Sequence, residues 1–75
     1  MGALEVYADN EGAFAALKTA IVFLAGRVGV DLSAPARHGH NWARWELSAD
    51  DAVKARDILA WHRLPVRVIL SVDER

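Results

Sequence analysis

Histidines are the residues of this 75-residue chain whose type and spacing could bind a metal ion. His38 and His40 stand two positions apart in the string HGHNW, and His62 lies further along the chain. Imidazole is a common ligand for zinc, copper and nickel, and catalytic zinc commonly has three protein ligands. A metal site formed by His38 and His40, with His62 as third ligand, is therefore one hypothesis. The simpler interpretation is a polar hairpin turn with exposed histidines, because Gly39 and Asn41 tolerate positive φ.

The other polar residues do not form a pattern that indicates acid–base or nucleophilic catalysis. Asp50 and Asp51 follow Ser48, where acidic residues favour the start of a helix. Glu5 and Glu46 are predicted to share a sheet face, where arginines could neutralise them. The chain has no cysteine, which excludes thiol chemistry. The sequence therefore favours a non-catalytic protein over an enzyme, and it indicates no cofactor.

Composition narrows the classes of partner. The formal net charge is −1 and the pI is near 6.2, whereas nucleic-acid binding usually needs a strongly basic surface. The absence of cysteine favours a reducing, cytoplasmic location. The longest apolar-rich stretch, 13–25, is too short to span a bilayer. A hydrophobic content of 53% is generous for one small core and favours self-association or a protein partner.

Hydrophobic periodicity predicts the elements that must position these residues. Period-two alternation predicts strands, and apolar residues three or four positions apart predict helices. The expected order is strand 3–8, helix 10–27, a weak edge strand 30–37 that contains Pro35, strand 42–48, helix 49–63 and strand 66–72. This order predicts a single α+β domain over 1–75. The simplest solution is a ferredoxin-like βαββαβ sandwich: a four-stranded antiparallel sheet with both helices on one face.

The same periodicity predicts the core, and His62 is expected to be partly buried beside it. The predicted core residues are Leu4, Val6, Phe14, Leu17, Ile21, Leu24, Trp45, Leu47, Ile58, Leu59, Val66, Val68 and Leu70.

Two faces remain outside this predicted core. On the first helix, Thr19, Val22 and Phe23 point away from the apolar stripe, and an apolar outward face marks a possible contact site. The free face of the sheet carries aromatic residues and charges. We expect its candidate partner-binding residues to be Tyr7, Trp42, Arg44 and Arg67. Docking onto a protein, or pairing of two such faces, suits this mixture better than RNA binding does.

The segment Asp9-Asn10-Glu11-Gly12 is followed by Phe14, Leu17, Ile21, Leu24-Ala25 and Gly29-Val30. In this series, the first 32 residues resemble the start of ACT-type regulatory domains. The chain departs from that pattern at Glu11, where a proline is usual, and at Asp31, where an asparagine is usual. The resemblance implies a homodimer that binds a small ligand, such as an amino acid, at its interface. It also implies that Asp9, Asn10 and Gly12 border that ligand.

Three functional hypotheses follow from the sequence. The leading one is a non-catalytic interaction or regulatory module, which includes an inhibitor that blocks a larger protein. The second is an ACT-like ligand-sensing homodimer, and the third is a histidine-based metal-binding protein.

Overall fold

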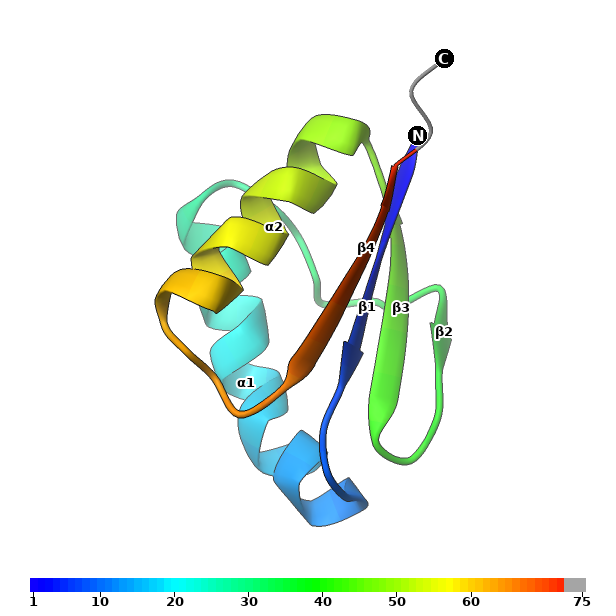
Figure 1. Cartoon of the computed structure of the whole chain (residues 1–75), viewed down its shortest axis with the longest axis vertical. Coiled ribbons are helices and arrows are strands. Elements are labelled where there is room, and N and C mark those ends of the chain that lie inside the picture. Colours follow the sequence, from blue (N-terminus) through cyan, green and yellow to red (C-terminus); the bar gives the residue numbers. More distant parts are fainter. Residues whose placement is uncertain (73–75) are drawn as a thin grey trace.

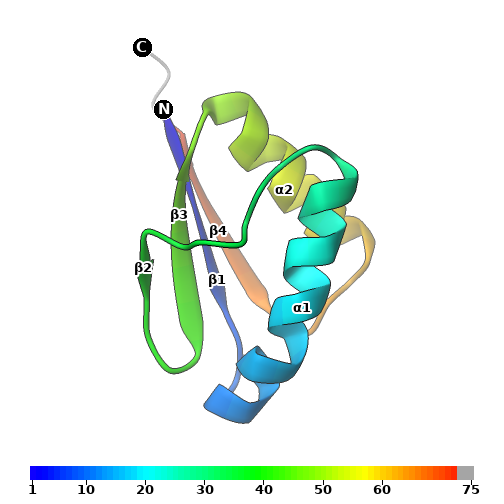
Figure 2. The ribbon, with the colours of Figure 1, turned by 180° about the vertical axis from the view of Figure 1, so that it is seen from behind.

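A computed structural model describes residues 1–72 and confirms the predicted ferredoxin-like architecture (Figure 1). Its elements are β1 (Gly2–Tyr7), α1 (Glu11–Arg27), β2 (Arg37–His38), β3 (Trp42–Leu47), α2 (Ala49–Trp61) and β4 (Arg67–Val72). The four strands form one antiparallel sheet in the order β2-β3-β1-β4. Both helices cover the same face of this sheet (Figures 1 and 2).

The central strand β1 sets the register of the sheet. Leu4 and Val6 alternate towards the helices and are completely buried. Tyr7 therefore points to the opposite, free face, where it lies across from Trp42 on β3 and Arg67 on β4. The residues of the free sheet face thus come from three neighbouring strands.

Both helices begin after an N-cap residue whose side chain accepts a hydrogen bond from a backbone amide of the first turn. The Asn10 side chain accepts a hydrogen bond from the Ala13 amide at 2.8 Å, so α1 begins directly after it. Ser48 accepts from the Asp51 amide at 3.1 Å and caps α2 in the same way. The predicted start of α1 at residue 10 is therefore one residue early. The helix ends near Gly29, whose φ of 82° lies in the region that favours glycine.

The second helix ends earlier than predicted, at Trp61 rather than at residue 63. Arg63 has a φ of 52°, which is incompatible with a continuing helix. His62 is the C-terminal cap residue of α2 and is exposed. The prediction of a partly buried His62 is therefore wrong, because α2 ends before this residue and its helical spacing does not continue to His62.

The segment that precedes β2 is the main departure from the predicted elements. A strand was expected over 30–37, but the sheet includes only Arg37 and His38 (Figure 2). Val30 and Leu32 are 2% and 0% exposed, so they fill the core between α1 and the sheet. The Val30 amide donates to the Ala25 carbonyl at 2.9 Å, so the backbone here bonds to the end of α1 rather than to a neighbouring strand. Sheet pairing therefore begins only where the Ala36 amide donates to the Arg44 carbonyl at 2.8 Å.

A buried tryptophan fastens this segment to the sheet. The Trp45 Nε1–H group donates to the Leu32 carbonyl at 3.0 Å, and the Trp45 side chain is almost fully buried. The hydrogen bond satisfies two polar groups that would otherwise be costly to bury.

The buried core also contains residues that the prediction omitted: Ala3, Ala8, Ala25, Val30, Leu32, Ala43, Ala52 and Ala55.

Several predicted core residues are only half-buried. They pack against the core but keep part of their surface in contact with solvent: Leu17, Leu47, Ile58, Leu70, Val66 and Val68. Val68 and Leu70 lie on β4, and Val66 directly precedes it; β4 is an edge strand with a neighbour on one side only. Within residues 1–72, no helix is long and apolar enough to cross a membrane.

Candidate interaction surfaces

The outward face of α1 is an exposed stripe of small residues with one aromatic ring. Its members lie three or four positions apart, and all are exposed: Gly12, Ala16, Thr19, Phe23 and Gly26. The buried residues of the same helix, which include Phe14 and Ile21, lie on the opposite side. Phe23 is 64% exposed although its ring is large and apolar. We call this stripe the α1 outward face.

A hollow of about 440 Å³ borders the α1 outward face. Its lining residues are Lys18, Thr19, Val22, Phe23 and Ser33. Four of them belong to α1, and Ser33 belongs to the segment that runs from the end of α1 to β2 (Figure 2). Val22 is half-buried and packs against the core, so it forms the inner wall of the hollow rather than projecting like Phe23.

The opposite wall of this hollow is shaped by a local turn. The Asp31 carboxylate accepts hydrogen bonds from the Ser33 hydroxyl at 2.6 Å and from the Ser33 amide at 2.9 Å. Both bonds lower the pKa of Asp31 from its ordinary value, and the bond from the Ser33 hydroxyl has the larger effect. The turn holds Ser33 beside Val22 and Phe23.

The free face of the sheet brings together the aromatic residues predicted to lie there. The rings of Tyr7 and Trp42 stack, with centroids 6.0 Å apart and an interplanar angle of 23°. Both side chains are half-buried. The indole of Trp42 lies directly against Gly39 in the β2–β3 hairpin, where an added Cβ would overlap the ring. Gly39 is therefore required by close approach rather than by its backbone angles.

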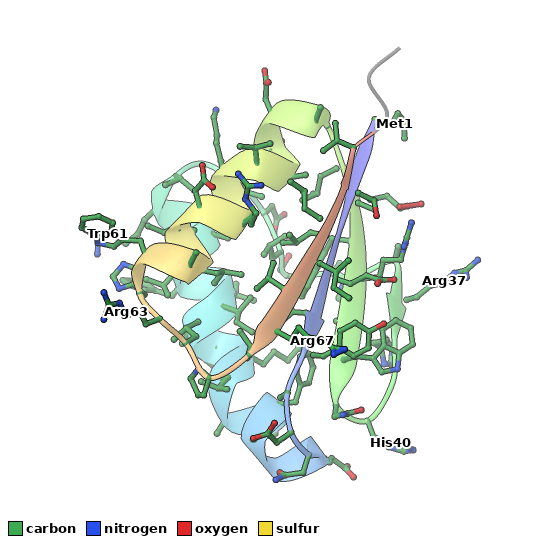
Figure 3. All side chains as sticks on the ribbon, viewed as in Figure 1. Met1, Arg37, His40, Trp61, Arg63 and Arg67 are labelled. Carbon is green, nitrogen blue, oxygen red and sulfur yellow. The ribbon has the colours of Figure 1, made fainter. Side chains whose placement is uncertain are left out.

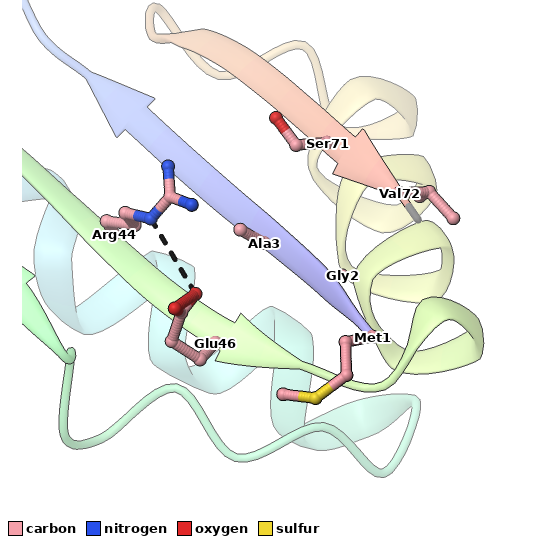
Figure 4. Close-up of a pocket in the computed structure, with 7 residues that line it drawn as sticks. All are labelled: Met1, Gly2, Ala3, Arg44, Glu46, Ser71 and Val72. Carbon is pink, nitrogen blue, oxygen red and sulfur yellow. Dashed lines mark ion pairs between the residues drawn. The ribbon is translucent and has the colours of Figure 1, made fainter. Parts of the chain in front are cut away.

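Arg44 on this sheet face interacts with two carboxylates. Arg44 Nη1 donates to Glu5 Oε2 at 2.9 Å. Figure 4 shows the second ion pair of this side chain, in which Arg44 Nε lies 3.7 Å from Glu46 Oε2. The hydrogen bond to Glu5 raises the pKa of Arg44 above its usual value. Arg67 lies across from Tyr7 at the other side of β1. Figure 3 shows Arg37 projecting from β2 on the side of the sheet away from the helices.

A shallow hollow of about 310 Å³ lies on the same sheet face (Figure 4). Its floor is Ala3, whose cross-strand neighbours are Glu46 on β3 and Ser71 on β4. The hollow exists because alanine carries only a methyl group between these longer side chains. The Arg44–Glu46 pair forms one wall, so the hollow holds both signs of charge.

The three predicted ligand-binding residues do not line a common hollow. Asp9 borders a depression of about 540 Å³, and Tyr7 and Arg67 also line it. Asn10 instead uses its side chain to cap α1, and Gly12 lies on the α1 outward face.

The predicted metal ligands are exposed, and they do not converge with His62. His38 and His40 lie in the β2–β3 hairpin, where His40 Nδ1 is 3.9 Å from Glu11 Oε2. His62 lies at the end of α2. Within the described residues, no three His, Cys, Asp or Glu side chains are grouped so that they could hold a metal ion.

Sequence reasoning assigned no role to Trp61, which is 80% exposed. Figure 3 shows Trp61 and Arg63 at the end of α2, projecting away from the sheet. A signal was present, because Trp61 follows the last buried residue of α2, Leu59, by two positions and therefore lies on another side of the helix.

No protein-family model, curated protein or solved structure matches this chain. The functional assignment therefore rests on the chemistry of its surfaces.

Proposed function

We propose that this protein is a non-catalytic interaction module and that its contact surface is the α1 outward face with the adjoining hollow. The observation that carries the proposal is the 64% exposed ring of Phe23 within a stripe that contains no charged residue. A solvated helix face normally carries several charges. Transfer of such a ring from water into an interface contributes about 2 kcal/mol.

The free sheet face is the less favourable contact surface. Its aromatic rings already stack on each other, and Arg44 already pairs with Glu5 and Glu46. A partner covering this face would remove water from one guanidinium and two carboxylates, which together carry a net charge of −1. Desolvation of such groups often outweighs the contacts that replace water.

A module of this kind acts by covering part of its partner. Where the covered surface is functional, the module regulates or inhibits the larger protein. The cysteine-free sequence suits a reducing compartment, so we place this action in the cytoplasm.

Photo-crosslinking from inside the surface tests the proposal. A benzoylphenylalanine at position 23 keeps an aromatic side chain there and reacts only with groups it touches. The matched control is the same residue at Lys54, which is exposed on α2. We expect protein adducts from position 23 in the cells that make the protein, and few from position 54. Equal adduct yields from both positions, or none from either, would contradict the proposal.

A second candidate function rests on the depression beside Asp9. Asp9 and Arg67 line the same hollow of about 540 Å³, so a carboxylate and a guanidinium are available to one small molecule. Such a pair suits the ammonium and carboxylate groups of a free amino acid. A thermal-shift screen of the amino acids tests this function, because a ligand of the native state raises the melting temperature. The candidate fails if no amino acid gives a shift that Arg67→Ala abolishes.

A further inference from the structure

The side chains of the α1 outward face are small in its N-terminal half, whereas its C-terminal half contains a large one. The half towards the helix N-terminus carries Gly12 and Ala16, with Ala15 exposed beside them. The other half carries the ring of Phe23. Thr19 lies between the two halves. Two copies of such a surface fit together when their helices run in opposite directions, because the large side chain of each copy then faces the small residues of the other.

Antiparallel pairing of two α1 helices about Thr19 matches these halves. In helix packing, a knob enters a hole formed by four residues at positions i, i+3, i+4 and i+7. Gly12, Ala15, Ala16 and Thr19 have this spacing, and their centre lies about as far before Thr19 as Phe23 lies after it. A two-fold axis at Thr19 therefore places each Phe23 ring in the hole of the other copy, so the contact is the same on both copies.

The charges near the helix ends favour the same direction. Glu11 lies eight residues before Thr19 and Arg27 lies eight residues after it. Antiparallel pairing brings Glu11 of one copy to the level of Arg27 of the other and also opposes the helix dipoles. Parallel pairing would instead place the Glu11 residues of the two copies at the same level, and likewise their Phe23 rings. Lys18 lies at the flank, where its long side chain reaches water.

We infer that the partner of the α1 outward face is a second copy of this chain, paired antiparallel through α1 with Thr19 on the two-fold axis. The inference rests on the proposed function and names its partner. A helix of 17 residues is about 25 Å long. One such helix pair buries less than about 1,200 Å², which is typical of transient contacts. The dimer is therefore reversible, with a Kd in the micromolar range or weaker.

Sedimentation equilibrium over a concentration series measures this association. Each Phe23 ring fills a hole, and loss of one such anchor weakens binding about tenfold or more. Because the dimer contains two rings, Phe23→Ala is expected to raise Kd at least about 100-fold, whereas Lys54→Ala leaves it unchanged. Circular dichroism confirms that both variants are folded. A wild-type chain that stays monomeric at millimolar concentration would overturn the inference, as would equal Kd values for the two variants.

Disulfide formation tests the direction and the register. The chain has no cysteine, so single substitutions report directly. Thr19→Cys is expected to form a covalent dimer with itself. Gly12→Cys and Gly26→Cys are each expected to remain uncrosslinked alone but to crosslink when mixed. In the antiparallel pair, equivalent Gly12 positions lie about 21 Å apart, far beyond the Cα separation that a disulfide spans. All three variants keep Phe23.

Other crosslinking patterns overturn the inference. Self-crosslinking of Gly12→Cys as fast as Thr19→Cys indicates a parallel pair. Failure of Thr19→Cys to crosslink at a concentration above the wild-type Kd excludes the proposed axis.

The failures of the two proposals are distinguishable. A monomeric pure chain together with position-23 adducts to a different protein contradicts self-association but leaves the interaction function standing. No association and no position-specific adduct contradicts both.

Discussion

The outward orientation of Phe23 predicts a sharp difference between two neighbouring positions of α1. Ile21 is 1% exposed and Phe23 is 64% exposed, although they are two residues apart in the same helix. Ile21→Ala removes a fully enclosed side chain and is expected to cost about 2–5 kcal/mol. Phe23→Ala removes a ring that lies mainly in water, so the free energy of unfolding is expected to change by less than about 0.5 kcal/mol. Both variants introduce alanine, so differences in helix propensity stay small.

Urea unfolding, followed by circular dichroism, measures this difference. A chain of this length has a total stability of about 4–11 kcal/mol. With an m-value of about 1 kcal/mol/M, Ile21→Ala is expected to lower the midpoint by about 2 M or more, and Phe23→Ala by less than about 0.5 M. The protein must be dilute, because association adds stability at high concentration. If Phe23→Ala lowers the midpoint as much as Ile21→Ala does, the ring belongs to the core and the α1 outward face is misassigned.

Three further predictions concern the segments around these surfaces. Trp45→Phe leaves a buried loop carbonyl without its donor, so urea unfolding is expected to show a loss of about 1–3 kcal/mol; an unchanged midpoint would contradict the anchoring role. Gly39→Ala forces the Trp42 ring from its site and is expected to cost about 1–3 kcal/mol and weaken the near-ultraviolet circular dichroism; an unaltered spectrum would refute that packing. Ser33→Ala removes the hydroxyl donor to Asp31 and is expected to raise the pKa of that carboxyl in a carbon-13 NMR titration. Because the folded-state pKa of Asp31 is lowered, its stabilisation is present above the unfolded-state pKa and is lost as pH falls through the folded-state pKa; an unchanged titration midpoint would contradict the assigned cause.

The strands β1, β3 and β4 and both helices were predictable because each buries one face, so that the periodicity of apolar residues follows the element. Their order left the ferredoxin-like sandwich as the simplest closed arrangement. The segment before β2 was not predictable in this way. Val30 and Leu32 alternate as they would in a strand, but they serve as core side chains of an irregular segment, and only tertiary packing separates these two cases.

The candidate surfaces were predictable to a similar degree. The helical phase of Ile21 and Leu24 implied that Phe23 points outward. The alternation along two strands implied that Tyr7 and Trp42 share a face, and the register makes them direct neighbours. Val22 is half-buried because it packs against the core, a contact that the helical periodicity did not indicate.

The sequence predicted only that arginines on the sheet face could neutralise Glu5, and it did not identify Arg44 as the partner. Its 2.9 Å hydrogen bond depends on the exact cross-strand register. That register cannot be read from alternation alone, because a shift by two residues keeps the same face.

An NMR dilution series tests the central claim most directly. The chain has a mass of 8.2 kDa, so amide resonances can be followed individually from micromolar to millimolar concentration. Self-association through α1 predicts concentration-dependent shifts concentrated at Ala16, Thr19 and Phe23, with little change at Tyr7 and Trp42. Shifts concentrated on the free sheet face instead, or none up to millimolar concentration, would contradict the claim.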